Sequence, residues 1–222
     1  IKEQNRTLLI IEDLDAIGFN ERKEILNINE FKSCIRWLSN FHAIFLNESP
    51  NHLWSIGTYW HLETRQDELA PLKDPELEAF AKKVDQKLNS TEFKTFVHGD
   101  AKVANFCFSR NELKVAAVDF QYIGGGCGIK DLTYFMGSVL DEKECENLED
   151  EILDYYFIHL KKALSILEKN INFISLESEW RYLYPLCWAD FTRFLMGWRP
   201  GHWKINSYTK KMMKTTSEVI TK

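Results

Sequence analysis

The segment FVHGDAKVANFCFS, residues 96–109, constrains the fold more than any other part of the sequence. Polar and small residues crowd into its central eight positions between apolar flanks: His98, Gly99, Asp100, Lys102 and Asn105. Polar groups at this density cost stability in a core unless each finds a hydrogen-bond partner. The sequence therefore predicts a functional loop that two apolar segments hold rigid.

Size and composition limit the classes of protein that this chain can belong to. With 222 residues, 45% of them hydrophobic and 27% charged, it has the composition of a soluble globular domain with a large core. A net charge of −5 argues against a nucleic-acid partner. Because there is no run of about 18 apolar residues, we expect no membrane span. The oligomeric state stays open.

Cysteine usage bears on the compartment. The number of cysteines, 5, is odd, and no CxxC spacing occurs. This argues against a zinc site or a disulfide scaffold and for a reducing compartment, so we expect a cytoplasmic protein. The chain begins at Ile1 without methionine and without a leader of the signal-peptide type, which suggests a truncated start.

The hydrophobic pattern predicts a mostly helical chain with few strands. Apolar residues at three- and four-residue steps are typical of amphipathic helices, here over 31–46, 75–89 and about 131–140, 145–169, 178–197 and 207–220. Short apolar runs predict a buried strand over 7–11 and a hairpin of 105–108 and 113–118, joined by SRNE. The expected fold class is α+β, with the polar loop leading into the hairpin.

Three residues of the loop and hairpin form a candidate site: Asp100, Asn105 and Asp119. A short hairpin brings its two ends together, so Asn105 and Asp119 can share a small volume. Carboxylate and amide oxygens suit Mg²⁺, which also takes phosphate oxygens and water. Asp100 could then accept a proton from a nucleophile that approaches a metal-bound phosphate.

These motifs resemble the catalytic and metal-binding signature of protein-kinase-like phosphotransferases. The HGD form resembles the aminoglycoside phosphotransferase and choline kinase branch, and the DFQ of 119–121 with the DLTYF of 131–135 is most similar to ecdysteroid kinase-like members. SNFHAIF at 39–45 and TLLIIEDL at 7–14 are similar to a helix and to the hinge strand of these families.

The resemblance implies a role for each matching residue in an ATP-dependent transfer to a small-molecule hydroxyl acceptor. It implies Asp100 as the base, with Asn105 and Asp119 as Mg²⁺ ligands. Lys102 either contacts a phosphate or is solvated. For His98 and Asp131 we favour structural roles, with a buried imidazole and a carboxylate that tethers the loop. The glycine-rich run 124–128 lacks the context of a phosphate-binding loop and is expected to be a short segment of the activation type.

The same resemblance predicts how the chain divides into domains. Residues 1–14 match the last strand of a small lobe and the hinge, and residues 15–222 match the large lobe, so the small lobe is largely missing from this chain. Backbone groups of Glu12, Asp13 and Leu14 are then expected to bind the adenine of ATP.

Aromatic residues near the end of the chain offer two interpretations. The region 180–203 contains 4 of the 7 tryptophans, and it is either core between the last helices or a wall of the acceptor site. Trp198 and Trp203, which flank a loop, are the better acceptor candidates, with Asp190 as an acidic one. An aromatic wall favours a lipophilic or amino-alcohol acceptor.

Two further classes of function compete with a kinase. A pseudokinase or ligand-binding module would keep the fold without the transfer, yet the residues Asp100, Asn105 and Asp119 are all intact. A helical scaffold with no nucleotide role would leave the polar loop without an explanation.

Overall fold

The computed structural model describes residues 2–3, 6–8, 10–69, 74–110 and 113–220, and helices dominate these ranges. The helices are α1 Ile28–Ile44, α2 Gln66–Leu69, α3 Pro75–Asn89, α4 Ile129–Val139, α5 Glu142–Ile166, α6 Phe173–Trp198 and α7 Ser207–Ile220. The strands are β1 Lys2–Glu3, β2 Arg6–Thr7, β3 Thr95–Val97, β4 Phe106–Phe108, β5 Val115–Ala117 and β6 Gly124–Gly126. The predicted α+β class is confirmed.

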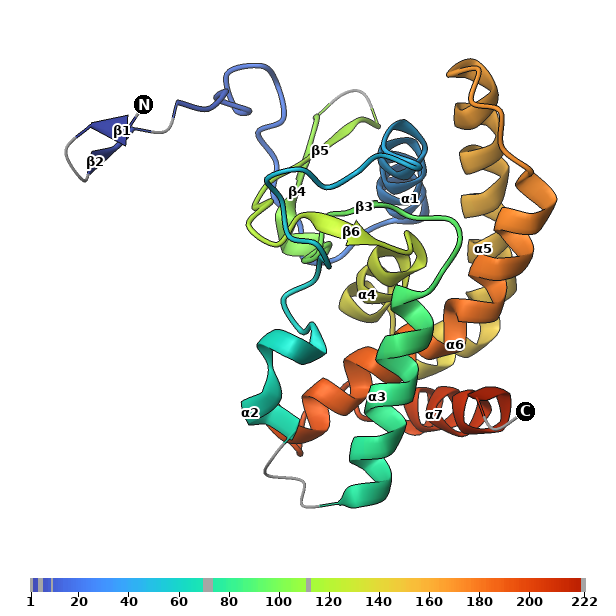
Figure 1. Cartoon of the computed structure of the whole chain (residues 1–222). Helices are drawn as coiled ribbons and strands as arrows, with labels where there is room; N and C mark the ends of the chain where they lie inside the picture. The colour runs from blue at the N-terminus through green and yellow to red at the C-terminus, as the bar shows by residue number, and fades with distance from the viewer. Residues whose placement is uncertain (1, 4–5, 9, 70–73, 111–112, 221–222) are drawn as a thin grey trace.

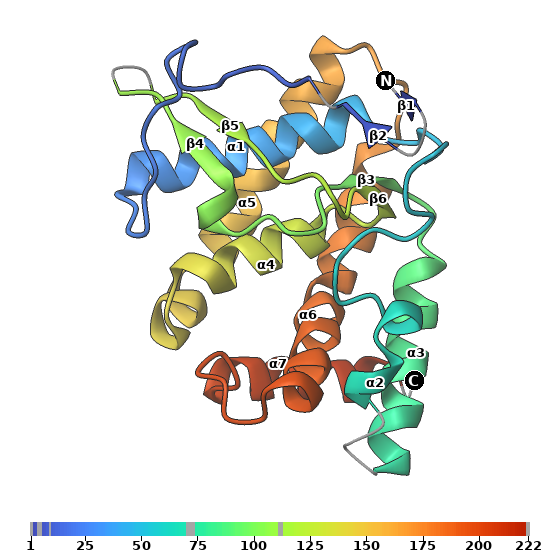
Figure 2. The same cartoon turned by 90° about the vertical axis from the view of Figure 1, so that its left-hand side faces the viewer.

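The helices enclose one large apolar core. α1 packs against α5, and α6 packs against α3, α4 and α7, as Figure 1 shows. Side chains from four of these helices meet with no exposed surface, among them Leu38, Phe135, Tyr156 and Trp180. The hairpin of β4 and β5 lies beside α1 at one edge of this helical body (Figure 2).

Local hydrogen bonds determine where several helices begin. Asn27 accepts from two backbone N–H groups of the first turn of α1, and Glu30 returns a bond to the Asn27 N–H. Asp141 and Glu144 repeat this capping box at α5. Such caps satisfy N–H groups that have no partner within the helix. The helix predicted over 75–89 is α3 with the same bounds.

The strands form three small antiparallel pairs. β4 pairs with β5 in the predicted hairpin, with Cys107 opposite Ala116. β3 pairs with β6, so the glycine run 124–126 is itself a strand. Neither β3 nor β6 was predicted. The three glycines of β6 carry no side-chain pattern that indicates a strand, and β3 has only three residues.

The prediction of a buried strand over 7–11 is wrong for the residues that the structure describes. β2 ends at Thr7 and pairs only with β1. Ile10 and Ile11 are 80% and 77% exposed. The segment extends away from the helical body (Figure 1), so its side chains at Ile10 and Ile11 stay outside the core. The chain rejoins the body at Glu21, whose backbone exchanges two hydrogen bonds with Phe108 of β4.

The remaining general expectations concern thiols and membranes. All five cysteines are buried and free of disulfides. Among the described residues, no helix is long and apolar enough to cross a bilayer.

Candidate functional site

The polar loop after β3 turns sharply at Gly99. Its φ of +81° is left-handed, a conformation that glycine adopts without steric cost. A Cβ at this position would overlap the carbonyl oxygen of Tyr122 and lie 2.8 Å from the backbone nitrogen of Thr58. The turn therefore requires glycine both for its backbone and for space, and Asp100 follows directly.

Asp131, in the first turn of α4, holds this turn from the side of the core. Its carboxylate accepts the backbone N–H groups of His98 at 2.6 Å and of Gly99 at 3.0 Å. The Nε2 atom of His42 lies 3.0 Å from the same carboxylate, and both side chains are fully buried. A helix N-terminus favours negative charge, which helps to keep this buried carboxylate in place. The geometry is that of a tether between α4 and the loop.

The ring of His98 joins the loop to the end of β5. Its Nε2 atom lies 2.9 Å from the carbonyl oxygen of Val118, and its Nδ1 atom accepts the N–H of Asp100 at 3.3 Å. A donor at Nε2 and an acceptor at Nδ1 define one neutral tautomer. The imidazole is fully buried, so it sets the spacing of loop and strand without reaching solvent.

Asp100 is buried, with its two carboxylate oxygens in different environments. Oδ2 accepts from Lys102 Nζ at 2.8 Å and from Asn105 Nδ2 at 3.0 Å. Oδ1 is buried and has no hydrogen-bond partner within the part of the chain that the structure describes. Leaving such an oxygen unpaired costs about 1–3 kcal/mol. The hydrogen bonds within the described part of the chain therefore leave one acceptor of the Asp100 carboxylate unused.

Asn105 and Asp119 lie at the base of the hairpin, as the sequence predicted. The Val118 N–H donates to the Asn105 carbonyl at 2.9 Å, which brings the two chain segments together. The Asn105 amide nitrogen is used by Asp100, so the amide oxygen points the other way. Asp119 is exposed and has a φ of +66°, a rare conformation outside glycine that often marks functional sites.

Asp100 and Lys102 open into a pocket of about 390 Å³. One wall comes from the chain after the hairpin, at Gln121 and Tyr122, and another from Tyr134 of α4. The remaining wall comes from the end of α6 and the loop that follows it: Phe191, Leu195, Trp198, His202 and Lys204, together with Tyr59. Lys102 is both paired with Asp100 and 41% exposed toward this space.

The two tryptophans predicted for the acceptor wall occupy different positions. Trp198 lines the pocket and is 56% exposed, with its ring stacked on Phe194. Trp203 is 61% exposed and lies outside the pocket lining, stacked on His202. The other two tryptophans of the region, Trp180 and Trp188, are core residues.

The prediction for Asp190 needs correction. Its carboxylate is 1% exposed and does not line the pocket. It is bound by Arg193 at 2.7 Å, by Trp60 Nε1 at 2.9 Å and by Lys130 at 3.4 Å. Burial raises the pKa of Asp190, but the charges of Arg193 and Lys130 outweigh it and hold this pKa below its usual range. Its charge is therefore compensated within the core, and an acceptor cannot reach it.

Tyr59, Tyr134 and Lys204 are among the pocket residues that the sequence did not indicate. Tyr134 donates to the hydroxyl of Tyr59 at 3.2 Å, and burial raises the pKa of both phenols. Lys204 is half-buried, and burial lowers its pKa to about 8, with Asp100 acting in the opposite direction. Tyr134 is three residues after Asp131, so the helical repeat could have placed it beside the tether. For Lys204 and Tyr59 the sequence carries no such signal.

The predicted hinge residues lie in an exposed segment before the body. The Asp13 side chain accepts the N–H groups of Asp15 and Ala16, and the Leu14 carbonyl accepts from Phe19 at 2.8 Å. Glu12 is exposed. The structure thus forms a turn here, and the Leu14 carbonyl is already used within it.

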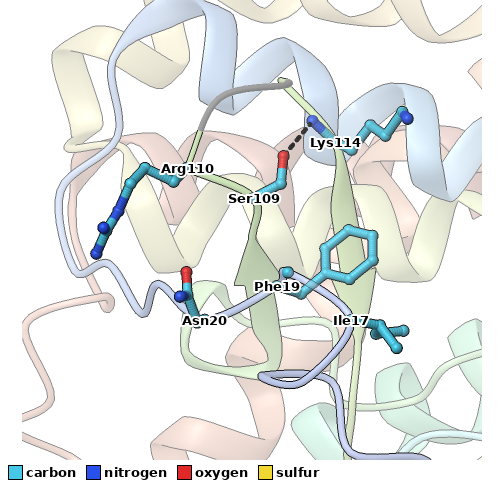
Figure 3. Close-up of a pocket in the computed structure, with 7 residues that line it drawn as sticks. Ile17, Phe19, Asn20, Ser109, Arg110 and Lys114 are labelled. Carbon is cyan, nitrogen blue, oxygen red and sulfur yellow. Dashed lines mark hydrogen bonds between the residues drawn. The ribbon is translucent and has the colours of Figure 1, made fainter.

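A second pocket, of about 440 Å³, lies at the far end of the hairpin from Asn105. Figure 3 shows it between the loop at Ile17 and Phe19 and the hairpin residues Ser109, Arg110 and Lys114. Arg110 is paired with Glu21. This pocket includes none of the predicted site residues. No cluster of three or more metal-binding His, Cys, Asp or Glu side chains occurs among the described residues.

The chain was compared with known proteins. No curated protein sequence matches it. A solved structure from Ralstonia eutropha JMP134, provisionally described as an aminoglycoside phosphotransferase, is similar at 13% identity with a TM-score of 0.46. The alignment covers 86% of this chain and 62% of that one, so this chain spans less than two thirds of that protein.

A protein family also matches the chain, over part of its sequence. The sequence pattern of the ecdysteroid kinase-like family matches residues 47–169, which is more than half of the 222 residues. This range contains the polar loop, the hairpin and Asp131, whereas the Glu12–Leu14 segment and the loop after α6 lie outside it. The resemblance in the motifs is confirmed: the chain belongs to the ecdysteroid kinase-like family.

Proposed function

We propose that the protein is an ATP-dependent phosphotransferase that moves the γ-phosphoryl group to a hydroxyl of a small molecule. The observation that carries this proposal is the unpaired, buried Oδ1 atom of Asp100 at the wall of a 390 Å³ pocket. A hydroxyl that enters the pocket supplies the missing donor. The same carboxylate is then in position to take the proton of that hydroxyl.

Asp100 is the base in this proposal. As the acceptor oxygen bonds to the γ-phosphorus, its proton passes to Asp100, and the bond between the γ-phosphorus and the ADP oxygen breaks. Lys102 and Asn105, both bonded to Oδ2, leave Oδ1 as the atom that receives the proton. We also assign Lys102, the cation of the loop, to contact with the transferred phosphate. His98 and Asp131 position the loop without touching substrate.

Asn105 and Asp119 are assigned to Mg²⁺. The amide oxygen of Asn105, directed away from Asp100, and the exposed carboxylate of Asp119 are hard oxygen donors that suit this ion. When bound, Mg²⁺ would neutralise charge on the nucleotide phosphates. The left-handed backbone of Asp119 supports this assignment, because such strain is concentrated at ligand sites.

We assign residues 1–14 to the hinge side of a nucleotide site and residues 15–222 to the large lobe. Adenine would bind backbone groups of Glu12, Asp13 and Leu14 other than the Leu14 carbonyl, which Phe19 occupies. Five buried, free cysteines support a reducing compartment, and we propose the cytoplasm.

The test is the Asp100→Asn variant of the full-length protein, with ADP release followed over a panel of alcohols. We expect a loss of about 10²–10⁴-fold in transfer, because the proton acceptor is gone. Binding of Mg·ATP should stay within a factor of about two, since Asp100 faces the acceptor. The control is Asp150→Asn, which removes an exposed carboxylate of α5.

The outcomes separate the kinase from its rival. Wild-type turnover in Asp100→Asn would overturn the role of Asp100. Nucleotide binding by the wild type without ADP release for any alcohol would instead favour a pseudokinase or binding module.

A further inference from the structure

The pocket beside Asp100 contains a cation of the chain itself. Lys204 lines the pocket, and its ammonium lies over three aromatic rings. The distances from Nζ to the ring centroids are 5.5 Å for Tyr134, 5.7 Å for Phe191 and 5.4 Å for Trp203. An aromatic group of this kind is a good site for a cation. Here Lys204 already fills it.

The backbone of Lys204 is fixed on both sides. Its N–H donates to Nδ1 of His202 at 3.1 Å, and its carbonyl accepts the hydroxyl of Thr209 at 2.9 Å. Thr209 is 3% exposed and belongs to the first turn of α7. These bonds fix the backbone position from which the Lys204 side chain reaches the rings.

Little negative charge faces this ammonium. Of the described residues that line the pocket, Asp100 alone is acidic, and Lys102 already pairs with it. Asp190, the carboxylate that could have balanced a second cation, is enclosed by Arg193 and Lys130. A cationic ligand would thus give up hydration on entering a space where the described residues supply two lysines and one carboxylate, and it would find no free negative charge among them in return.

We infer, on the basis of the proposed phosphotransferase function, that Lys204 makes the pocket selective for uncharged alcohols with an apolar body and excludes cationic ones. The rings of Tyr134, Trp198 and Phe191 offer apolar contact, while the ammonium occupies the place where an amine would bind. Repulsion between like charges at short range in a partly desolvated site is an effective means of rejecting the wrong ligand. Of the two acceptor types favoured by the aromatic residues alone, the lipophilic alcohol remains.

The test uses two alcohols of the same shape that differ by one charge. Benzyl(2-hydroxyethyl)dimethylammonium is the cation, and 3,3-dimethyl-4-phenylbutan-1-ol replaces its nitrogen by carbon. Their dissociation constants are measured at pH 7 by ligand-observed NMR titration, without nucleotide, on the full-length wild type. Lys204→Met removes the charge at similar length, and Lys204→Arg keeps it. Lys211→Met removes an exposed lysine of α7 that pairs with Glu146, outside the pocket.

We expect the wild type to bind the neutral alcohol at least about tenfold more tightly than the cation. In Lys204→Met the ratio should fall to about one or invert, because the aromatic rings become free for the ammonium ligand. Lys204→Arg and Lys211→Met should keep the ratio of the wild type. Equal binding of the two alcohols by the wild type, an unchanged ratio in Lys204→Met, or no binding of either alcohol would overturn the inference.

The pH gives a second readout of the same charge. Raising the pH from 7 to 9 passes the pKa of Lys204, about 8, so the wild-type ratio should fall toward that of Lys204→Met. The groups that face Lys204 do not produce this change. Burial raises the pKa of Tyr59, Tyr134 and Cys145 and lowers that of His202, and Asp100 with Lys102 forms an ion pair. A ratio that stays constant over this range would count against Lys204.

Binding and transfer are measured separately, so the two proposals can fail independently. Charge selectivity without ADP release from either alcohol would overturn the phosphotransferase and leave the role of Lys204 standing. ADP release that is equally fast with both alcohols would support the phosphotransferase and overturn the role of Lys204.

Discussion

At the scale of single residues, two residues of the candidate site are held in locally unfavourable states. Asp100 keeps one buried oxygen without a partner, and Asp119 keeps a left-handed backbone. The first costs about 1–3 kcal/mol and the second about 1 kcal/mol. Natural proteins depart from good local chemistry mainly where function requires it. Both departures fall on residues that the sequence motifs had selected.

Asp119 can be tested with two substitutions that separate charge from conformation. Asn tolerates the left-handed backbone but lacks the charge, whereas Ala lacks both. We expect each to weaken Mg·ATP binding by at least about tenfold, because each removes the charged ligand. Only Asp119→Ala should also lower the free energy of unfolding, by about 1 kcal/mol. Titration calorimetry and urea unfolding measure the two effects, and wild-type Mg·ATP affinity in both variants would refute the metal assignment.

Asn105 has a second role that the sequence did not reveal. Its amide nitrogen holds Asp100 Oδ2 and the Asp100 carbonyl, in addition to the proposed use of its amide oxygen for Mg²⁺. Loss of Asn105 should therefore disturb the base as well as the metal, even though a neutral ligand contributes less to metal binding than Asp119.

At the scale of elements, the loop between β3 and β4 depends on the close approach of the Gly99 backbone to the backbones of Tyr122 and Thr58. Its geometry is set by Asp131 on α4, by His98 toward β5 and by the turn at Gly99. A loop held from two sides in this way keeps Asp100 in one position, as its proposed role of proton acceptor requires.

Gly99 and Gly18 provide a matched pair for testing whether the close backbone contact at Gly99 requires glycine. Both have positive φ, +81° and +97°, but a Cβ at Gly18 meets nothing within 4 Å. Gly18→Ala should cost about 1 kcal/mol of unfolding free energy, from backbone strain alone. Gly99→Ala adds the overlap with the Tyr122 carbonyl and should cost about 3 kcal/mol or more. Similar losses in urea unfolding would show that the loop has room to move.

At the scale of the whole molecule, the pocket beside Asp100 combines residues from Tyr59 to Lys204. We propose it as the acceptor site, and Trp198 and Trp203 can be compared directly. Trp198 lines the pocket, whereas Trp203 contacts Lys204 from outside the lining. Trp198→Ala should raise the acceptor KM by about three- to tenfold and leave ATP affinity unchanged. Trp203→Ala should raise the acceptor KM by a smaller factor than Trp198→Ala does. Unchanged acceptor kinetics in both variants would assign the rings to packing alone.

The sequence by itself determined the local structure and the motif. The α3 helix follows from the Asp74 cap, Pro75 and a regular apolar stripe, and the hairpin from two short apolar runs around a turn. The HGD, DFQ and DLTYF motifs resemble the family for the same reason. These features depend on neighbours along the chain, so their physical cause is visible in a short segment.

The tertiary structure alone decided which charges face the pocket. Asp190 is turned inward because Trp60, 130 residues away, and Lys130 meet its carboxylate. Lys204 is turned toward the pocket because α4 and α6 supply rings beneath it. The apolar run 7–11 looks buried in sequence, yet Ile10 and Ile11 stay exposed because no described segment packs over them. Burial and pairing of charge depend on contacts between distant segments, and composition does not encode them.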